Sequence, residues 1–294
     1  MRLLLVLFAL IAVSSGSVWN GGFRIRFDVG TDIGGSFFYD IPRNVTDAVS
    51  EGWTLKDQPS DLPVTSVDMY CYSDLIVCTF YDANGDVAGM QVALPVDDFT
   101  DNYYDMEETG FTKWTPAVED GETEVSYWTL QQYFTTEEIL SSRKGRATRD
   151  NENKIIENGG VWVMGVGKEL VQVANTTDEL VSGGLFTQQA CIPWMGRHYY
   201  YNMSSNTSCT DEPLFPWFPI VDSGELIATG FMVFGNLTLD SDARNWFEAP
   251  SQTAVEVIVP SGPDCLYELA DSPGVVTMHV YYVNEPWLVT CIFQ

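Results

Sequence analysis

The sequence predicts a mainly β protein made of antiparallel sheets, in a sandwich or barrel-like arrangement, braced by disulfides and carrying one or two short helices. Short apolar runs recur along the chain, each bounded by Gly, Pro, Asn or Asp. This pattern is typical of antiparallel sheets rather than of alternating β–α units. Helix signals are few, and the six cysteines form an even number that suits three disulfides.

The expected strands follow from local patterns. Apolar and charged residues alternate over residues 23–29, as in a half-buried strand. Residues 75–81 and 87–94 flank Asp82-Ala83-Asn84-Gly85-Asp86, and Asn-Gly between two such runs predicts a hairpin. Further strands are expected over residues 125–130, 161–166, 169–173, 226–234, 254–259 and 275–283.

Two helix starts are expected from capping boxes. Thr135-Thr136-Glu137-Glu138 precedes Ile139, and Thr176-Thr177-Asp178-Glu179 precedes Leu180. In this arrangement a threonine side chain and a glutamate three residues later satisfy backbone N–H groups of the first turn. We therefore expect one or two short helices packed against the sheets.

The N-terminal segment resembles a signal peptide. Arg2 precedes an apolar run over residues 3–13, and small residues follow at 14–17. The run is too short to span a bilayer. We expect residues 1–17 to be a signal peptide and 18–294 a single secreted β-rich domain, without a membrane span.

The cysteines fit an oxidising compartment. They are Cys71, Cys78, Cys191, Cys209, Cys265 and Cys291. Because each consecutive pair brackets a short hairpin or excursion, we expect pairing of Cys71 with Cys78, Cys191 with Cys209, and Cys265 with Cys291, although spacing alone permits other connectivities.

Five Asn-x-Ser/Thr acceptors are expected to be glycosylated on the surface of a secreted chain. They are Asn44, Asn175, Asn202, Asn206 and Asn236. The chain is also strongly acidic, with 41 acids against 14 bases and a net charge of −27. Such a field repels nucleic acid and favours extracellular proteins or cationic surfaces as partners, besides a small ligand.

A cluster of acids is a weak candidate for calcium, because carboxylate oxygens are the ligands that this ion prefers. Its members are Asp97, Asp98, Asp101, Asp105, Glu107 and Glu108. The Asp82–Asp86 segment begins like an EF-hand loop, but Val87 stands where the turn glycine belongs. We therefore interpret that segment as a hairpin turn.

Residues 143–154 form a basic, polar segment without hydrophobic periodicity. It is expected to be an exposed loop, and it offers an alternative division into halves 18–142 and 155–294. The Arg-x-x-Arg spacing ending at Arg146 and again at Arg149 also makes it a candidate processing site.

The familiar catalytic motifs are missing from the sequence, including Gly-x-Ser-x-Gly and His-Glu-x-x-His. The chain has only two histidines, His198 and His279. Either could act as a general base, and both together with a carboxylate could bind zinc or copper. We expect them not to share a metal. Strand alternation places His279 with Thr277 and Tyr281, opposite Met278, Val280 and Tyr282.

The sequence therefore favours a secreted acidic glycoprotein with a non-enzymatic binding or structural role in an extracellular fluid or matrix. The alternative is a secreted enzyme or small-ligand carrier with an aromatic pocket that uses His198 or His279. Trp194, Trp217 and Trp287 lie beside prolines in the second half and could line such a pocket. A pocket that joins both histidines to a buried carboxylate would favour the alternative.

Overall fold

The structure is a computed structural model that describes residues 21–28, 30, 34–118, 123–142, 155–156 and 159–292. Strands account for 38% of it and helices for 18%, which confirms the predicted mainly β class. Within the described residues there are six α-helices rather than one or two. The expected signal peptide and the basic segment 143–154 lie outside these residues.

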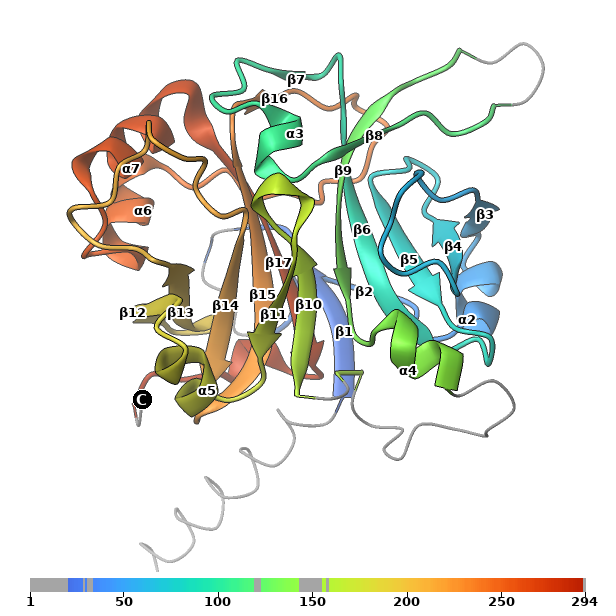
Figure 1. Ribbon diagram of the computed structural model, residues 1–294, viewed down its shortest axis with the longest axis horizontal. Helices are drawn as coiled ribbons and strands as arrows, with labels where there is room; N and C mark the ends of the chain where they lie inside the picture. Colours follow the sequence, from blue (N-terminus) through green and yellow to red (C-terminus); the bar gives the residue numbers. More distant parts are fainter. Residues whose placement is uncertain are drawn as a thin grey trace, which may run out of the picture.

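Two large antiparallel sheets form the body of the protein (Figure 1). The seven-stranded sheet has the order β12 (Phe186–Ile192), β13 (Gly196–Tyr201), β14 (Trp217–Asp222), β15 (Glu225–Phe234), β17 (Val275–Val283), β1 (Gly21–Arg26) and β2 (Phe38–Asp40). The eight-stranded sheet has the order β11 (Leu170–Ala174), β10 (Gly160–Met164), β9 (Tyr127–Tyr133), β6 (Val87–Pro95), β5 (Val77–Tyr81), β4 (Asp68–Cys71) and β3 (Thr54–Lys56), with β8 (Thr112–Trp114) paired to β9. Strands from before and after residues 143–154 occur in both sheets.

The remaining elements are short. The helices are α2 (Val45–Ser50), α3 (Met106–Thr109), α4 (Glu137–Ser142), α5 (Thr177–Ser182), α6 (Gln252–Ile258) and α7 (Asp264–Leu269). Single-turn segments are η1 (Val166–Lys168), η2 (Ala270–Gly274) and η3 (Pro286–Leu288), and β7 (Phe99–Thr100) pairs with β16 (Asn236–Leu237).

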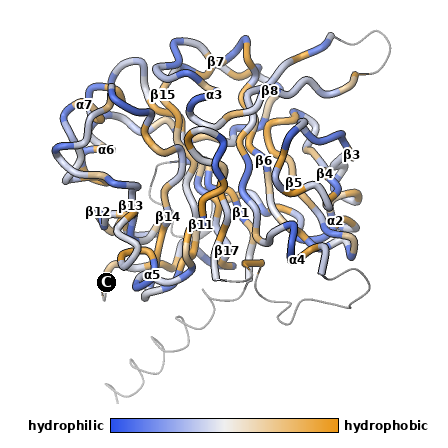
Figure 2. The backbone as a smooth tube through the Cα atoms, viewed as in Figure 1, coloured by the Kyte–Doolittle hydropathy of each residue, from blue (hydrophilic) through white to orange (hydrophobic). Residues whose placement is uncertain are grey.

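The seven-stranded sheet is buried on both faces. Met278, Val280 and Tyr282 of β17 belong to the core shared with the eight-stranded sheet. Tyr281 belongs to a second apolar cluster, which includes Leu266 of α7. In Figure 1, α6 and α7 accordingly lie beside β14 and β15, away from β5 and β6. Figure 2 shows hydrophobic residues gathered on the central strands and hydrophilic residues on the peripheral turns. The fold is thus a sandwich with a third, helical layer.

A buried polar triad fixes how the two sheets face each other. Gln132 of β9 accepts hydrogen bonds through Oε1 from Thr229 Oγ1 of β15 at 2.7 Å and from the Tyr282 hydroxyl of β17 at 2.8 Å. All three residues are buried. A buried polar group without a partner is costly, so sliding one sheet past the other would be penalised.

Several local predictions are confirmed. The backbone N–H of Asp82 donates to the carbonyl of Asp86 at 2.9 Å, which closes the β5–β6 hairpin. The Thr176 hydroxyl accepts from the N–H of Glu179, as expected of the N-cap of α5, and it also donates to the Glu179 carboxylate. At α4 the capping residue is Thr136 rather than Thr135.

The predicted strand over 254–259 is wrong, because the segment forms α6. The Ser251 hydroxyl accepts a hydrogen bond from the N–H of Ala254, an N-cap that begins the helix. Gln252 donates to Glu256 one turn later. Val255 and Val259, four residues apart, are both buried in the second apolar cluster. Two of the β-branched residues that suggested a strand therefore form the buried side of α6 and its C-terminal end.

Three disulfides are present, but only one has the expected pairing. Cys71 and Cys78 lie opposite each other on β4 and β5 and are joined as predicted. The pairs Cys191–Cys209 and Cys265–Cys291 were wrong; the bonds are Cys191–Cys291 and Cys209–Cys265. The C-terminal segment runs past the β12–β13 turn, where Trp194 N–H donates to the Val289 carbonyl. Pairing cysteines by their closeness in the sequence was wrong here because α7, which carries Cys265, was not predicted.

Close packing on the seven-stranded sheet yields a stability prediction. A Cβ on Gly230 of β15 would lie 1.9 Å from the Phe218 ring, so Gly230→Ala should lower the free energy of unfolding by about 3 kcal/mol. In the control Gly183→Ala, the Cβ would lie 3.7 Å from its nearest neighbour, and φ is −69°. Chemical denaturation of both variants measures this, and equal stabilities would contradict the packing argument.

Candidate functional site

A cavity of about 380 Å³ lies between the seven-stranded sheet and the helical layer. Its walls are mostly apolar and include Met232 and Phe234 of β15, Val255 and Ile258 of α6, and Leu266 of α7. Exposed residues of α6 also line it, among them Val257, which is 59% exposed. The cavity therefore opens to solvent along α6. Its volume is within the range of small-molecule sites, near the lower end.

Both histidines of the chain line this cavity. His198 lies on β13 and His279 on β17, and their ring centroids are 5.9 Å apart with the planes at 85°. His279 is on the face with Tyr281, as alternation predicted, and Phe218 of β14 packs against both imidazoles. Gly230, between β14 and β17, gives that ring its space. The fold thus joins two histidines that are far apart in the sequence.

A buried carboxylate completes the group. Glu248 lies in the segment before α6, where its N–H and carbonyl pair with Thr277 of β17. Its Oε2 is 2.8 Å from Nδ1 of His279, although the approach departs from that of a linear hydrogen bond. Both side chains are almost completely buried, at 1% and 3% exposure. Two acceptors at this distance would repel, so the close approach favours the form of His279 with a hydrogen on Nδ1.

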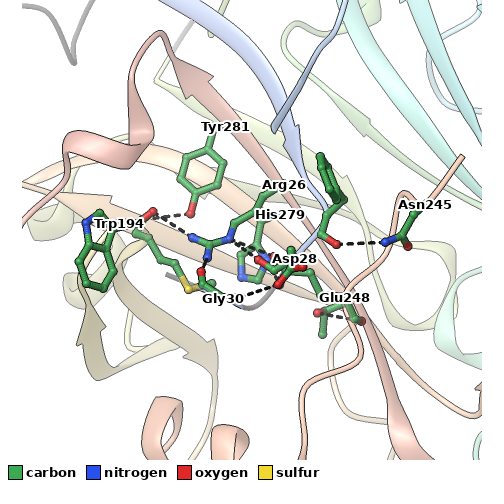
Figure 3. Close-up of polar contacts among 11 residues, drawn as sticks. Arg26, Asp28, Gly30, Trp194, Asn245, Glu248, His279 and Tyr281 are labelled. Atoms are coloured by element: carbon green, nitrogen blue, oxygen red, sulfur yellow. Dashed lines mark hydrogen bonds and ion pairs between the residues drawn. The ribbon is translucent and has the colours of Figure 1, made fainter. Parts of the chain in front are cut away.

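Arg26 of β1 neutralises Glu248. Its Nε is 3.2 Å from Glu248 Oε1, and its side chain is 1% exposed. The guanidinium also donates to three backbone carbonyls, those of Asp28, Trp194 and Gly30 (Figure 3). These acceptors satisfy the charged group away from water. Three of the five N–H donors of Arg26 are therefore committed to backbone carbonyls.

His198 is neutral at ordinary pH. Its pKa is lowered to about 3, mainly by burial and also by the neighbouring His279 and Arg26, against the opposing effect of the Gly196 and Ala190 carbonyls. Its Nδ1 lies 3.2 Å from the Gly196 carbonyl oxygen. A carbonyl only accepts, so Nδ1 carries the hydrogen and Nε2 is a bare acceptor. In the described structure, Nε2 of neither histidine has a hydrogen-bond partner.

The other predicted site residues lie elsewhere. None of the five glycosylation acceptors is buried, and Asn202, Asn206 and Asn236 are exposed. Asp105 caps α3, and Glu107 and Glu108 occupy its first turn, which suits the helix dipole. Asp98 has its pKa raised by burial and by the nearby Asp240 and Asp97.

The metal and processing predictions stay predictions. Within the described residues, no group of three or more His, Cys, Asp or Glu side chains could hold a metal ion. Calcium binding by the acidic cluster and the absence of a metal shared by the histidines are therefore untested. Arg146 and Arg149 lie outside the described residues.

Sequence reasoning missed Arg26 and Glu248. The alternation over 23–29 was interpreted only as a half-buried strand, whereas Arg26 is itself buried against Glu248. Glu248 stands in Trp246-Phe247-Glu248-Ala249-Pro250, a lone acid in an apolar segment. An isolated charge in such surroundings is a signal of a buried ion pair.

Comparisons of this protein with family models, curated proteins and solved structures give no match. Among the described helices, none has the length and apolar character needed to cross a bilayer. The function is therefore inferred from the residues of the chain itself.

Titration of His198 should make stability depend on pH. Because its pKa falls from 6.5 in the unfolded chain to about 3 in the folded protein, its contribution is complete above pH 6.5 and is lost as pH falls toward 3. From pH 7 to 5, the parent should lose on the order of 1–2 kcal/mol more unfolding free energy than His198→Gln. Urea denaturation at each pH measures this, and parallel losses would contradict it.

The buried ion pair gives a second prediction. Arg26→Met leaves Glu248 buried without its counterion and should cost about 3–5 kcal/mol of unfolding free energy. Arg24→Met is the control on the same strand, since Arg24 pairs with Asp40, whose side chain is 74% exposed. That change should cost about 1 kcal/mol or less. Similar losses for both variants would contradict a special role of Arg26.

Proposed function

We propose that this protein is a secreted, acidic glycoprotein that binds a small, mostly apolar molecule in the cavity under α6. The observation that carries the proposal is the cavity itself: its mostly apolar lining includes the buried polar residues His198, His279 and Glu248, and Glu248 is paired with Arg26. Largely apolar pockets with a few convergent polar groups are typical of small-molecule sites.

The secreted setting is supported by two features. All six cysteines are paired, and none of the five glycosylation acceptors is buried. Structural disulfides persist in oxidising compartments. A structural role in a matrix requires no internal cavity, so among non-enzymatic roles we favour a ligand carrier in an extracellular fluid. The acidic surface would keep such a carrier dispersed by self-repulsion.

An enzyme is the second candidate, because Glu248 orients His279 as an acid orients the base of a catalytic group. The favoured reaction class would be proton abstraction from a bound ligand by Nε2 of His279. In the described structure that atom has no hydrogen-bond partner, so a partnered nucleophile is not seen. Binding therefore ranks above catalysis.

The cavity can be tested with N-phenyl-1-naphthylamine, an uncharged apolar probe that becomes fluorescent in apolar surroundings. We expect saturable binding with a Kd on the order of 10 µM. Ala254→Trp, on the cavity side of α6, should weaken binding at least tenfold by filling the space. Glu256→Trp, at an exposed position outside the cavity lining, should bind like the parent.

Absence of saturable binding, or equal binding by Ala254→Trp and the parent, would overturn the carrier proposal. Recovery of an identified ligand chemically unchanged after long incubation supports carriage. Product formation that Glu248→Gln abolishes would instead support the enzyme.

A further inference from the structure

We infer that the polar end of the bound molecule is an uncharged hydroxyl group, as in an aliphatic alcohol or a phenol, which donates its proton to Nε2 of His198. This inference rests on the proposed function and names the ligand class of the same cavity. It follows from which hydrogen-bond donors and acceptors of the polar residues in the cavity have no partner within the protein.

The protein offers the ligand a hydrogen-bond acceptor, Nε2 of His198. Because Nδ1 of His198 donates to the Gly196 carbonyl, Nε2 presents a lone pair and no hydrogen. The imidazole is completely buried, lines the cavity and has no protein partner for Nε2 in the described structure. A buried acceptor without a donor is costly, so a ligand that brings a donor recovers that cost.

A carboxylate head group does not fit this end of the cavity. It would bring acceptors toward the bare Nε2 of His198 and a negative charge toward Glu248. Arg26 is the nearby cation, but its guanidinium already pairs with Glu248 and donates to three backbone carbonyls. Arg26 is also not among the residues that line the cavity, so it is not placed to hold a carboxylate there in the bidentate manner.

An ammonium or a ketone fits less well than a hydroxyl. An ammonium would have to give up its hydration among apolar walls, and the attraction of Glu248 for it is offset by the Arg26 charge paired with that carboxylate. A ketone only accepts and leaves Nε2 of His198 unpaired. A hydroxyl donates its proton to Nε2 of His198 and carries no charge that has to be desolvated.

The test compares 1-octanol, 2-octanone and octanoate by isothermal titration at pH 7.5. The alcohol and the ketone contain the same numbers of carbon and oxygen atoms, and only the alcohol has a donor. We expect 1-octanol to bind about tenfold more tightly than 2-octanone, and octanoate to bind more weakly than 1-octanol.

Two variants locate the effect. His198→Phe should bring the affinity ratio of alcohol to ketone to about one, while keeping an apolar wall. Tyr200→Phe, which removes the hydroxyl of a neighbouring residue of the same cavity, should preserve the ratio.

A measurement on the parent protein needs no variant. The chain has two histidines, so ¹⁵N-histidine labelling gives few ring resonances. The Nε2 resonance of His198 should move upfield with 1-octanol and stay unchanged with 2-octanone, as expected for a nitrogen that accepts a hydrogen bond.

The outcomes separate the two proposals. If none of the three compounds binds, the carrier proposal fails. If all three bind with equal affinity and the Nε2 resonance does not move, the carrier stands and the hydroxyl inference is overturned. Tightest binding of octanoate would also overturn it.

Discussion

The contact between Arg26 and Glu248 is the interaction on which the helical layer and the cavity depend. A charge buried in an apolar region is tolerated only when it is paired and hydrogen-bonded. Arg26 meets this requirement by drawing together Glu248, the Trp194 carbonyl and the Gly30 carbonyl, which come from three separate segments. The pair therefore anchors the chain before α6 and the β12–β13 turn over one face of the sheet.

The seven-stranded sheet is mostly apolar on both faces. Each face nevertheless carries one group of polar side chains, and the two groups have different roles. Toward the eight-stranded sheet, the Thr229 and Tyr282 hydroxyls bond Oε1 of Gln132 and so join the two sheets. Toward the helices, His198 and His279 each keep a ring nitrogen without a protein partner. The first group specifies packing, and the second gives the cavity its chemical character.

Local patterns predicted much of the sheet structure, including the hairpin at Asp82–Asp86 and the face of β17 that carries His279. They failed at α6, because Val255 and Val257 suit a strand as well as a short helix, and only the Ser251 cap favours the helix. The site was harder to foresee. Its members come from β1, β13, β17 and the Glu248 segment, and strand order across the sheet is not encoded in any one of these stretches. The cysteine pairing failed for the same reason.

The disulfides divide the helical layer into a tethered and an untethered part. Cys265 ties α7 covalently to the segment after β13 through Cys209, whereas α6 carries no cysteine and is held by side-chain packing and its N-cap. Elements without covalent anchors open at a lower free energy than those that have them. The residence time of a molecule in the cavity would then be governed by excursions of α6, and substitutions on its buried stripe would change dissociation rates without altering the polar end.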